Sequence, residues 1–215
     1  MPRTVVTLES VVRRAWAGVC LVVIVVVGGC GTGQMSATEY VDRINAIVAP
    51  ATQKGEALVA EAAQTTDFTP QRLQEGLERA LREIRVPLQE AADEIEPPAP
   101  IADLHYLMWD WHSRFIPIER ALATRAAAAA DTAEDWEALS ESPEMAAYRA
   151  QLAEGKQVCS DFQGELDARA EGGGFAIDSW LAAELEEIGK AVLGCESFPE
   201  HPENVYRYPP PTSTP

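Results

Sequence analysis

From residue 36 onward, apolar residues recur at intervals of three and four, which is the period of an amphipathic helix. Polar and proline-containing breaks divide this pattern into separate helices. The predicted helices begin at Ser36, at Thr69–Pro70, near Ile101, at Ser142–Pro143 and at Asp178–Ser179, with a short one around Trp136 and Leu139. Most of these starts carry a capping residue or a proline at the first helical position. Because no alternating strand pattern follows residue 36, the sequence predicts an all-α fold.

The spacing also predicts how the helices pack. Seven-residue repeats in helices joined by short breaks predict a left-handed antiparallel helical bundle of four to five long helices. Pro50, Pro87 and Pro117 fall inside predicted helices, and the apolar register continues past the last two, so we expect kinks there. Such kinks either open space for a ligand or curve a helix around the core.

The bundle domain is predicted over 36–197, and a proline-rich extended tail follows over 198–215. A helix is excluded in the tail because of its prolines. We expect the larger apolar side chains of the tail to pack against the bundle: Phe198, Val205, Tyr206 and Tyr208.

Before the first predicted helix lies an apolar run, 15–29, which follows a segment carrying three arginines. As a helix this run would span about 22 Å, against roughly 30 Å for the hydrocarbon core of a bilayer, so it has the length of a secretory signal. The run ends in Val27-Gly28-Gly29-Cys30, which resembles the bacterial lipobox. In that class of signals the cysteine sulfur receives a diacylglycerol and the chain is cut before the cysteine.

This resemblance implies that 1–29 is a lipoprotein signal peptide that is removed, that Cys30 is the lipidation site, and that 30–35 is a short lipidated tether. The protein would then lie at the extracytoplasmic face of the cell membrane, held there by lipid. The alternative is an uncleaved signal anchor with an incidental cysteine.

The chain is strongly acidic, with a formal net charge of −17. Residues 1–29 hold three arginines and one glutamate, net +2, so their removal would change this to −19. Such a body is repelled by nucleic acid phosphates and by anionic headgroups. We therefore expect no nucleic-acid partner, and we expect the membrane to be reached through the two acyl chains on Cys30.

Two further cysteines, Cys159 and Cys195, are predicted to form a disulfide, because disulfides persist in exported proteins. From Cys159 to Glu171 a helix rises about 18 Å, and from Trp180 to Cys195 about 22 Å. An antiparallel hairpin would therefore bring the two cysteines to the same level, on the apolar sides of their helices. The alternative is a pair of buried free thiols.

No stretch of the sequence carries a recognisable catalytic or cofactor motif. No histidine has a glutamate three residues before it, as ferritin-like metal bundles require. His105 and His112 are seven residues apart, about 10 Å along a helix, which is too far to share a metal ion. Phosphate loops, nucleophile elbows and paired-cysteine motifs are also missing from the sequence. We expect no metal, no cofactor and no catalysis.

The stretch from His105 to His112 is rich in aromatic side chains, and Trp109 and Trp111 fall on nearly opposite sides of the predicted helix. His105, Trp109 and His112 share a stripe with Ile116 and Glu119, which makes those three residues candidates for the wall of a ligand-binding pocket. The alternative is a central helix that packs against neighbours on two faces, as aromatic residues at helical spacing usually do.

The sequence resembles uncharacterised actinobacterial cell-envelope lipoproteins in three features. These are the lipobox, the helical body and a carboxyl-terminal pattern that runs from Trp180 through Leu193-Gly194-Cys195 to Tyr208. The resemblance implies no activity. We expect a non-catalytic accessory or protein-interaction module of the envelope, with an unknown envelope protein or small ligand as partner. The alternative is a ligand-binding lipoprotein with an interhelical pocket beside the His105–His112 helix.

Overall fold

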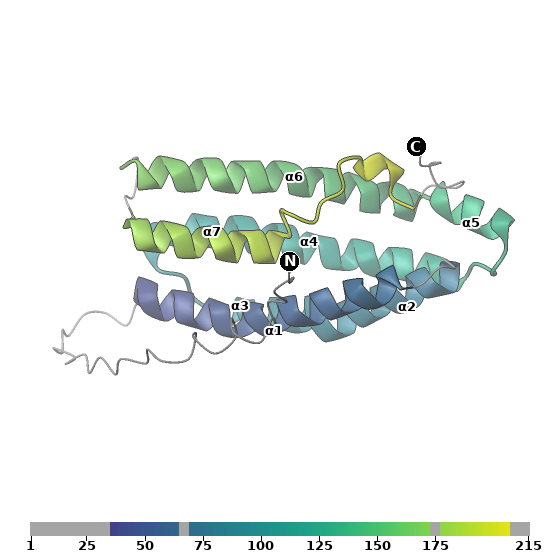
Figure 1. Cartoon of the computed structure of the whole chain (residues 1–215), viewed down its shortest axis with the longest axis horizontal. Coiled ribbons are helices and arrows are strands. Elements are labelled where there is room, and N and C mark those ends of the chain that lie inside the picture. The colour runs from purple at the N-terminus through teal and green to yellow at the C-terminus, as the bar shows by residue number, and fades with distance from the viewer. Residues whose placement is uncertain (1–34, 65–68, 173–176, 207–215) are drawn as a thin grey trace, which may run out of the picture. The chain divides into compact units, whose positions relative to one another are not determined.

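The computed structural model describes residues 35–64, 69–172 and 177–206, and within these ranges the chain is helical and contains no strand. The elements are α1 (Ala37–Ala63), α2 (Pro70–Ala80), the π-helical segment η2 (Leu81–Arg85), α3 (Val86–Asp93), the 3-10 turn η3 (Ala99–Ile101), α4 (Ala102–Ala127), α5 (Ala133–Ser140), α6 (Pro143–Ala170), α7 (Ser179–Leu193) and the 3-10 turn η4 (Pro202–Asn204). The long helices lie side by side in a bundle (Figure 1), which confirms the predicted fold class.

The helices begin where the sequence places their caps. Ser36, Thr69 and Ser142 occupy N-cap positions, and the side-chain oxygen of each accepts a hydrogen bond from the backbone N–H three residues later, at 3.2, 3.3 and 3.2 Å. Asp178 also stands at an N-cap, although its side chain makes no capping hydrogen bond. At the other end of α7, Gly194 adopts the left-handed conformation (φ +72°) that commonly ends a helix.

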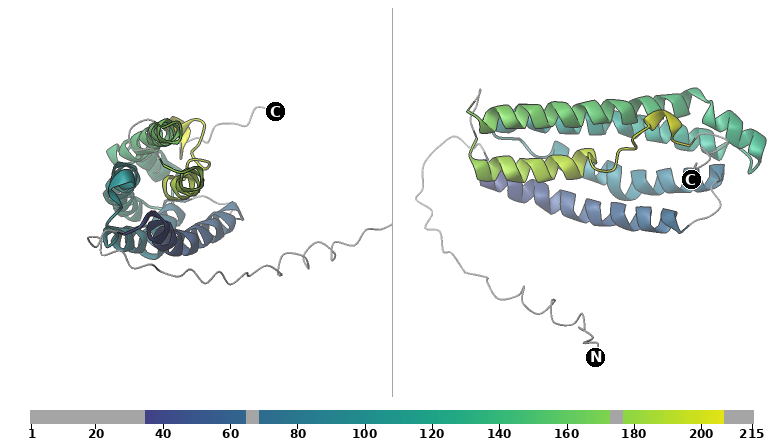
Figure 2. Two further views of the ribbon diagram at one scale, coloured as in Figure 1. Left: turned by 90° about the vertical axis from the view of Figure 1, so that its left-hand side faces the viewer. Right: turned by 45° about the horizontal axis from the view of Figure 1, so that its top comes forward.

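Helix α4 is the central element of the core, because it packs against α2, α3, α6 and α7. Figure 2 shows the long helices grouped around a common axis. Trp109 and Trp111 are both buried, so α4 contacts neighbours on two faces. Other apolar side chains of this helix are buried as well: Leu104, Met108, Phe115 and Leu122.

The three internal prolines are accommodated without ending their helices. Helix α1 continues through Pro50 and α4 continues through Pro117. Pro87 has no N–H to donate to the carbonyl of Glu83, four residues earlier. Directly before it the chain takes up the π turn η2, in which the N–H of Val86 bonds the carbonyl of Leu81. The carbonyl oxygen of Glu83 instead accepts a hydrogen bond from Lys54 Nζ of α1 at 3.2 Å.

Helices α6 and α7 form an antiparallel hairpin that carries the predicted disulfide (Figure 1). Cys159 and Cys195 are bonded, with an S–S distance of 2.06 Å and a Cα–Cα distance of 5.8 Å. The separation falls within the usual range for disulfides, which confirms the pairing derived from helix rise.

The tail continues from the end of α7 alongside α6. Phe198 packs edge-on against Trp111, with ring centroids 5.8 Å apart, and Arg149 Nε donates to the carbonyl of Val205 at 2.8 Å. Tyr206 packs against Tyr148 of α6, as the sequence analysis expected, whereas Tyr208 lies outside the described residues. Helix α7 has 15 residues and α6 has 28. Beyond Gly194 the tail, and not a helix, therefore packs beside α6.

Candidate functional site

The lipidation residue predicted from the sequence, Cys30, lies outside the described residues, as does the whole of 1–29. In the part of the chain that the structure does describe, no helix combines the length and the apolarity that crossing a bilayer would need. Lipidation therefore stays a prediction from the sequence.

The three residues proposed as a pocket wall, His105, Trp109 and His112, lie in the core, with exposed fractions of 4%, 4% and 0%. The Tyr40 hydroxyl of α1 and His105 Nδ1 are hydrogen-bonded at 2.9 Å. His112 Nδ1 bonds Gln89 Oε1 of α3, also at 2.9 Å. Each histidine thus joins α4 to a different neighbouring helix.

Burial changes the acid–base chemistry of both histidines. Loss of solvation disfavours the charged imidazolium and lowers the pKa of His105 to about 4 and that of His112 to about 3. For His112 the guanidinium of Arg85 lowers the pKa further, whereas Asp93 partly opposes the shift at His105. Both rings are neutral at neutral pH, so they act here as hydrogen-bonding members of the core.

The structure therefore places these three residues in the two-faced packing arrangement that the sequence offered as the alternative to a pocket wall. Trp109 Nε1 and His112 Nε2 are buried without a hydrogen-bond partner. Their rings instead contact each other edge-on, with centroids 5.6 Å apart. A ligand-binding role for the three stays a prediction.

A cavity of about 440 Å³ lies farther along α4, where α7 has ended. Its walls come from the second half of α1, from α2, from α4 and α6, and from the end of the described tail. The residues that line it are Leu58, Val59, Glu61, Ala62, Arg72, Leu73, Glu75, Gly76, Leu77, Arg79, Ala80, Glu119, Tyr148 and Tyr206. His105, Trp109 and His112 do not contribute to this lining, although Glu119 lies on the same stripe of α4.

Glu119 is the most unusual residue of this cavity, because a carboxylate is rarely buried without strong pairing. Its exposed fraction is 3%, and its Oε2 atom has no hydrogen-bond partner. Arg85 Nε of η2 lies 3.4 Å from that atom and forms an ion pair with it. Burial raises the pKa of the Glu119 carboxyl, and Arg85 opposes the shift.

Arg85 itself is shared between two contacts. Its guanidinium carbon lies 5.3 Å from the centroid of the Phe115 ring, a cation–π distance. The Arg85 guanidinium thus makes a cation–π contact with Phe115 and an ion pair with the buried carboxylate of Glu119.

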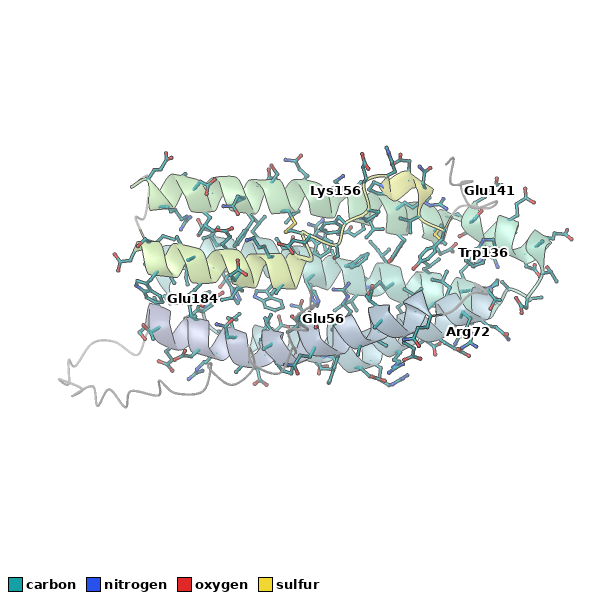
Figure 3. All side chains as sticks on the ribbon, in the orientation of Figure 1. Glu56, Arg72, Trp136, Glu141, Lys156 and Glu184 are labelled. Carbon is teal, nitrogen blue, oxygen red and sulfur yellow. A yellow bond between two sulfur atoms is a disulfide. The ribbon has the colours of Figure 1, made fainter. Side chains whose placement is uncertain are left out.

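The rim of the cavity is charged and exposed, in contrast to its interior. Arg79 Nη1 of α2 pairs with Glu61 Oε2 of α1 at 2.6 Å, and Arg72 lies 3.7 Å from Glu75. Figure 3 labels Arg72 at this end of the bundle. Val59 of α1 also lines the cavity and is 70% exposed.

In the sequence Glu119 falls on the stripe of His105 and His112, and no role was predicted for it. The available signal was a carboxylate on an otherwise aromatic and apolar stripe of a central helix. The sequence could not predict which residues line the cavity together with Glu119. Tyr148 and Tyr206 come from α6 and the tail, 29 and 87 residues away along the chain.

Among the described residues, no group of three or more histidine, cysteine, aspartate or glutamate side chains is arranged to hold a metal ion. No protein-family model, curated protein or solved structure matches the chain.

Proposed function

We propose that this chain is a lipid-anchored protein of the extracytoplasmic face of the cell membrane, and that its helical body is a non-catalytic accessory or protein-interaction module of the cell envelope. The anchor is inferred from the sequence, where a positive segment and a short apolar run end in Val27-Gly28-Gly29-Cys30. The resemblance of the sequence to uncharacterised actinobacterial cell-envelope lipoproteins favours the same proposal.

The observation that carries this proposal is the Cys159–Cys195 disulfide. Disulfides persist in oxidising compartments and are rare where thiols are kept reduced, so the bond supports an extracytoplasmic location. This support is independent of the signal, because it comes from residues more than a hundred positions further along the chain.

The non-catalytic part of the proposal is supported by how the histidines of α4 are used. His105 and His112, the two imidazoles of the helical body, are tied to Tyr40 and Gln89 inside the core and are held neutral by burial. They connect helices, so their contribution is to the packing of the bundle.

The anchor is tested by replacing the cysteine that would carry the lipid. Cys30→Ala should block lipidation and normal processing, so that a precursor retaining 1–29 accumulates and detergent partitioning of the mature form is lost. Cys20→Ala is the matched control, because Cys20 lies in the segment that would be removed. It should leave the mature protein unchanged. Equal processing of the two variants would contradict the proposal.

A ligand-binding role is the second candidate function, and one observation favours it. Helix α4, the helix of His105 and His112, contributes Glu119 to a cavity whose volume of about 440 Å³ is within the range of small-molecule sites.

A further inference from the structure

We propose that the cavity between α1, α2, α4, α6 and the tail binds a small molecule that combines an apolar body with one ammonium group, and that the Glu119 carboxylate receives the ammonium group. The proposal deepens the ligand-binding candidate and is independent of the lipid anchor.

The interior of the cavity suits an apolar body. Leu73 and Leu77 of α2 are almost fully buried, and Leu58, Ala62 and Ala80 add further aliphatic surface. An apolar ligand that leaves water for this lining gains about 25 cal/mol for each Å² it buries. The volume of the cavity is sufficient for a ligand with a single aromatic ring.

Polar recognition falls to Glu119, because its buried Oε2 atom has no hydrogen-bond donor. Arg85 Nε is 3.4 Å away, which is an ion-pair distance and is longer than a usual N–H···O hydrogen bond. A buried acceptor without a donor is costly, so a ligand that brings N–H groups to Glu119 would offset that cost.

A positively charged donor fits this position better than a neutral or negative one. Hydrogen bonds from a cation to a carboxylate are roughly twice as strong as neutral ones. Tyr148 and Tyr206 also line the cavity, and an aromatic ring attracts a nearby cation. The net charge of −17 raises the local concentration of cations around the protein.

An anionic ligand is less favoured, because the arginines of the lining, Arg72 and Arg79, are already paired with Glu75 and Glu61. Its charge would be brought close to Glu119, and it could gain Arg85 only by competing with Glu119 and Phe115 for the guanidinium. The ammonium proposal therefore predicts an order of affinities among ligands that differ only in their polar group.

Three probes of similar size supply this comparison: phenethylamine, phenethyl alcohol and hydrocinnamate, which present an ammonium, a hydroxyl and a carboxylate on the same aromatic body. In calorimetric titrations of the full chain, phenethylamine should bind about tenfold or more tightly than the alcohol, and hydrocinnamate should bind most weakly. In Glu119→Gln the affinity for phenethylamine should fall to that for the alcohol.

A pair of glycine variants tests the location of the site without altering its charges. Gly76 on the rim and Gly164 on α6 are both exposed helical glycines, and a Cβ at either position would meet no atom within 4 Å. Gly76→Leu should place a side chain at the mouth of the cavity and weaken phenethylamine binding about tenfold or more. Gly164→Leu, which is not part of the lining, should bind like the unaltered chain. This pair decides the location even if Glu119→Gln does not fold.

The outcomes distinguish two claims: that the cavity binds a ligand, and that Glu119 receives an ammonium group. If none of the three probes binds, or if Gly76→Leu binds phenethylamine as well as Gly164→Leu does, the cavity is not a ligand site and the ligand-binding candidate fails with it. If the alcohol or hydrocinnamate binds as tightly as phenethylamine, or if Glu119→Gln keeps the preference for the amine, the ammonium assignment is wrong.

Discussion

At the scale of single residues, helix α4 carries three titratable groups that are buried in the bundle: His105, His112 and Glu119. The pKa values of the two histidines and of the glutamate are shifted in opposite directions. Burial lowers the pKa of both histidines and raises that of the glutamate carboxyl, because in each case the charged form loses its solvation.

The two histidines should make the bundle sensitive to acid. In the unfolded chain a histidine binds a proton below about pH 6.5, whereas the folded chain resists protonation until about pH 4 at His105 and about pH 3 at His112. Stability is therefore present above pH 6.5 and is lost as the pH falls below it. By about pH 4 each histidine should have removed roughly 3 kcal/mol from the free energy of unfolding. Glu119, whose pKa is raised, changes stability in the opposite direction and reduces the loss.

Urea unfolding at about pH 7 and about pH 4.5 measures this effect. His112→Asn can keep a hydrogen-bonding group near the position of Nδ1 while removing the titration, so its loss of stability between the two conditions should be smaller. If the unaltered chain has the same free energy of unfolding at both pH values, these histidines are not held neutral by burial. The same conclusion follows if His112→Asn loses as much stability between the two pH values as the unaltered chain does.

At the scale of secondary-structure elements, α6 and α7 approach each other closely at a glycine. Gly189 of α7 faces Phe162 of α6, and a Cβ built on Gly189 would lie 2.3 Å from the Phe162 ring. Because Phe162 is 3% exposed and packed within the core, its ring has little room to move. The missing side chain thus sets the spacing of the hairpin that carries the disulfide.

This close contact predicts different effects for the same substitution at two glycines. Both Gly189 and Gly164 lie inside helices, so alanine improves helix propensity by about 1 kcal/mol at either position. At Gly189 the added methyl group overpacks the core, which typically costs about 1–3 kcal/mol. Denaturant unfolding should therefore find Gly189→Ala less stable than Gly164→Ala by about 1–3 kcal/mol. Equal stability of the two variants would mean that the helices are farther apart.

At the scale of the whole molecule, the sequence predicted those features that depend on local chemistry or on simple helix geometry. The caps at Ser36, Thr69 and Ser142 depend on residues three positions apart, and the disulfide follows from two nearly equal helix rises. Packing of α4 on two faces was one of two interpretations that the sequence offered, because a helix fixes the directions of its side chains. The burial of both Trp109 and Trp111 agrees with that interpretation.

The cavity was not predictable in the same way, because it depends on how segments far apart in the chain meet. Helix α7 ends at Leu193, and the tail continues along α6 until the ring of Tyr206 contacts that of Tyr148. The apolar periodicity of each helix does not predict this contact between the tail and α6. The π turn before Pro87 was also missed: the sequence predicted a kink, but not that Lys54 of another helix would supply the donor that proline removes.

We propose that lipid on Cys30 holds the helical body outside the cytoplasm and that the Cys159–Cys195 disulfide links α6 to the end of α7. Intact mass spectrometry of the protein extracted from membranes without a reducing agent tests both parts at once. The mass should be that of a chain that begins at Cys30, carries a diacylglycerol, and lacks the two hydrogens that a disulfide removes. A mass that includes 1–29, or an unmodified chain with two free thiols, would contradict it.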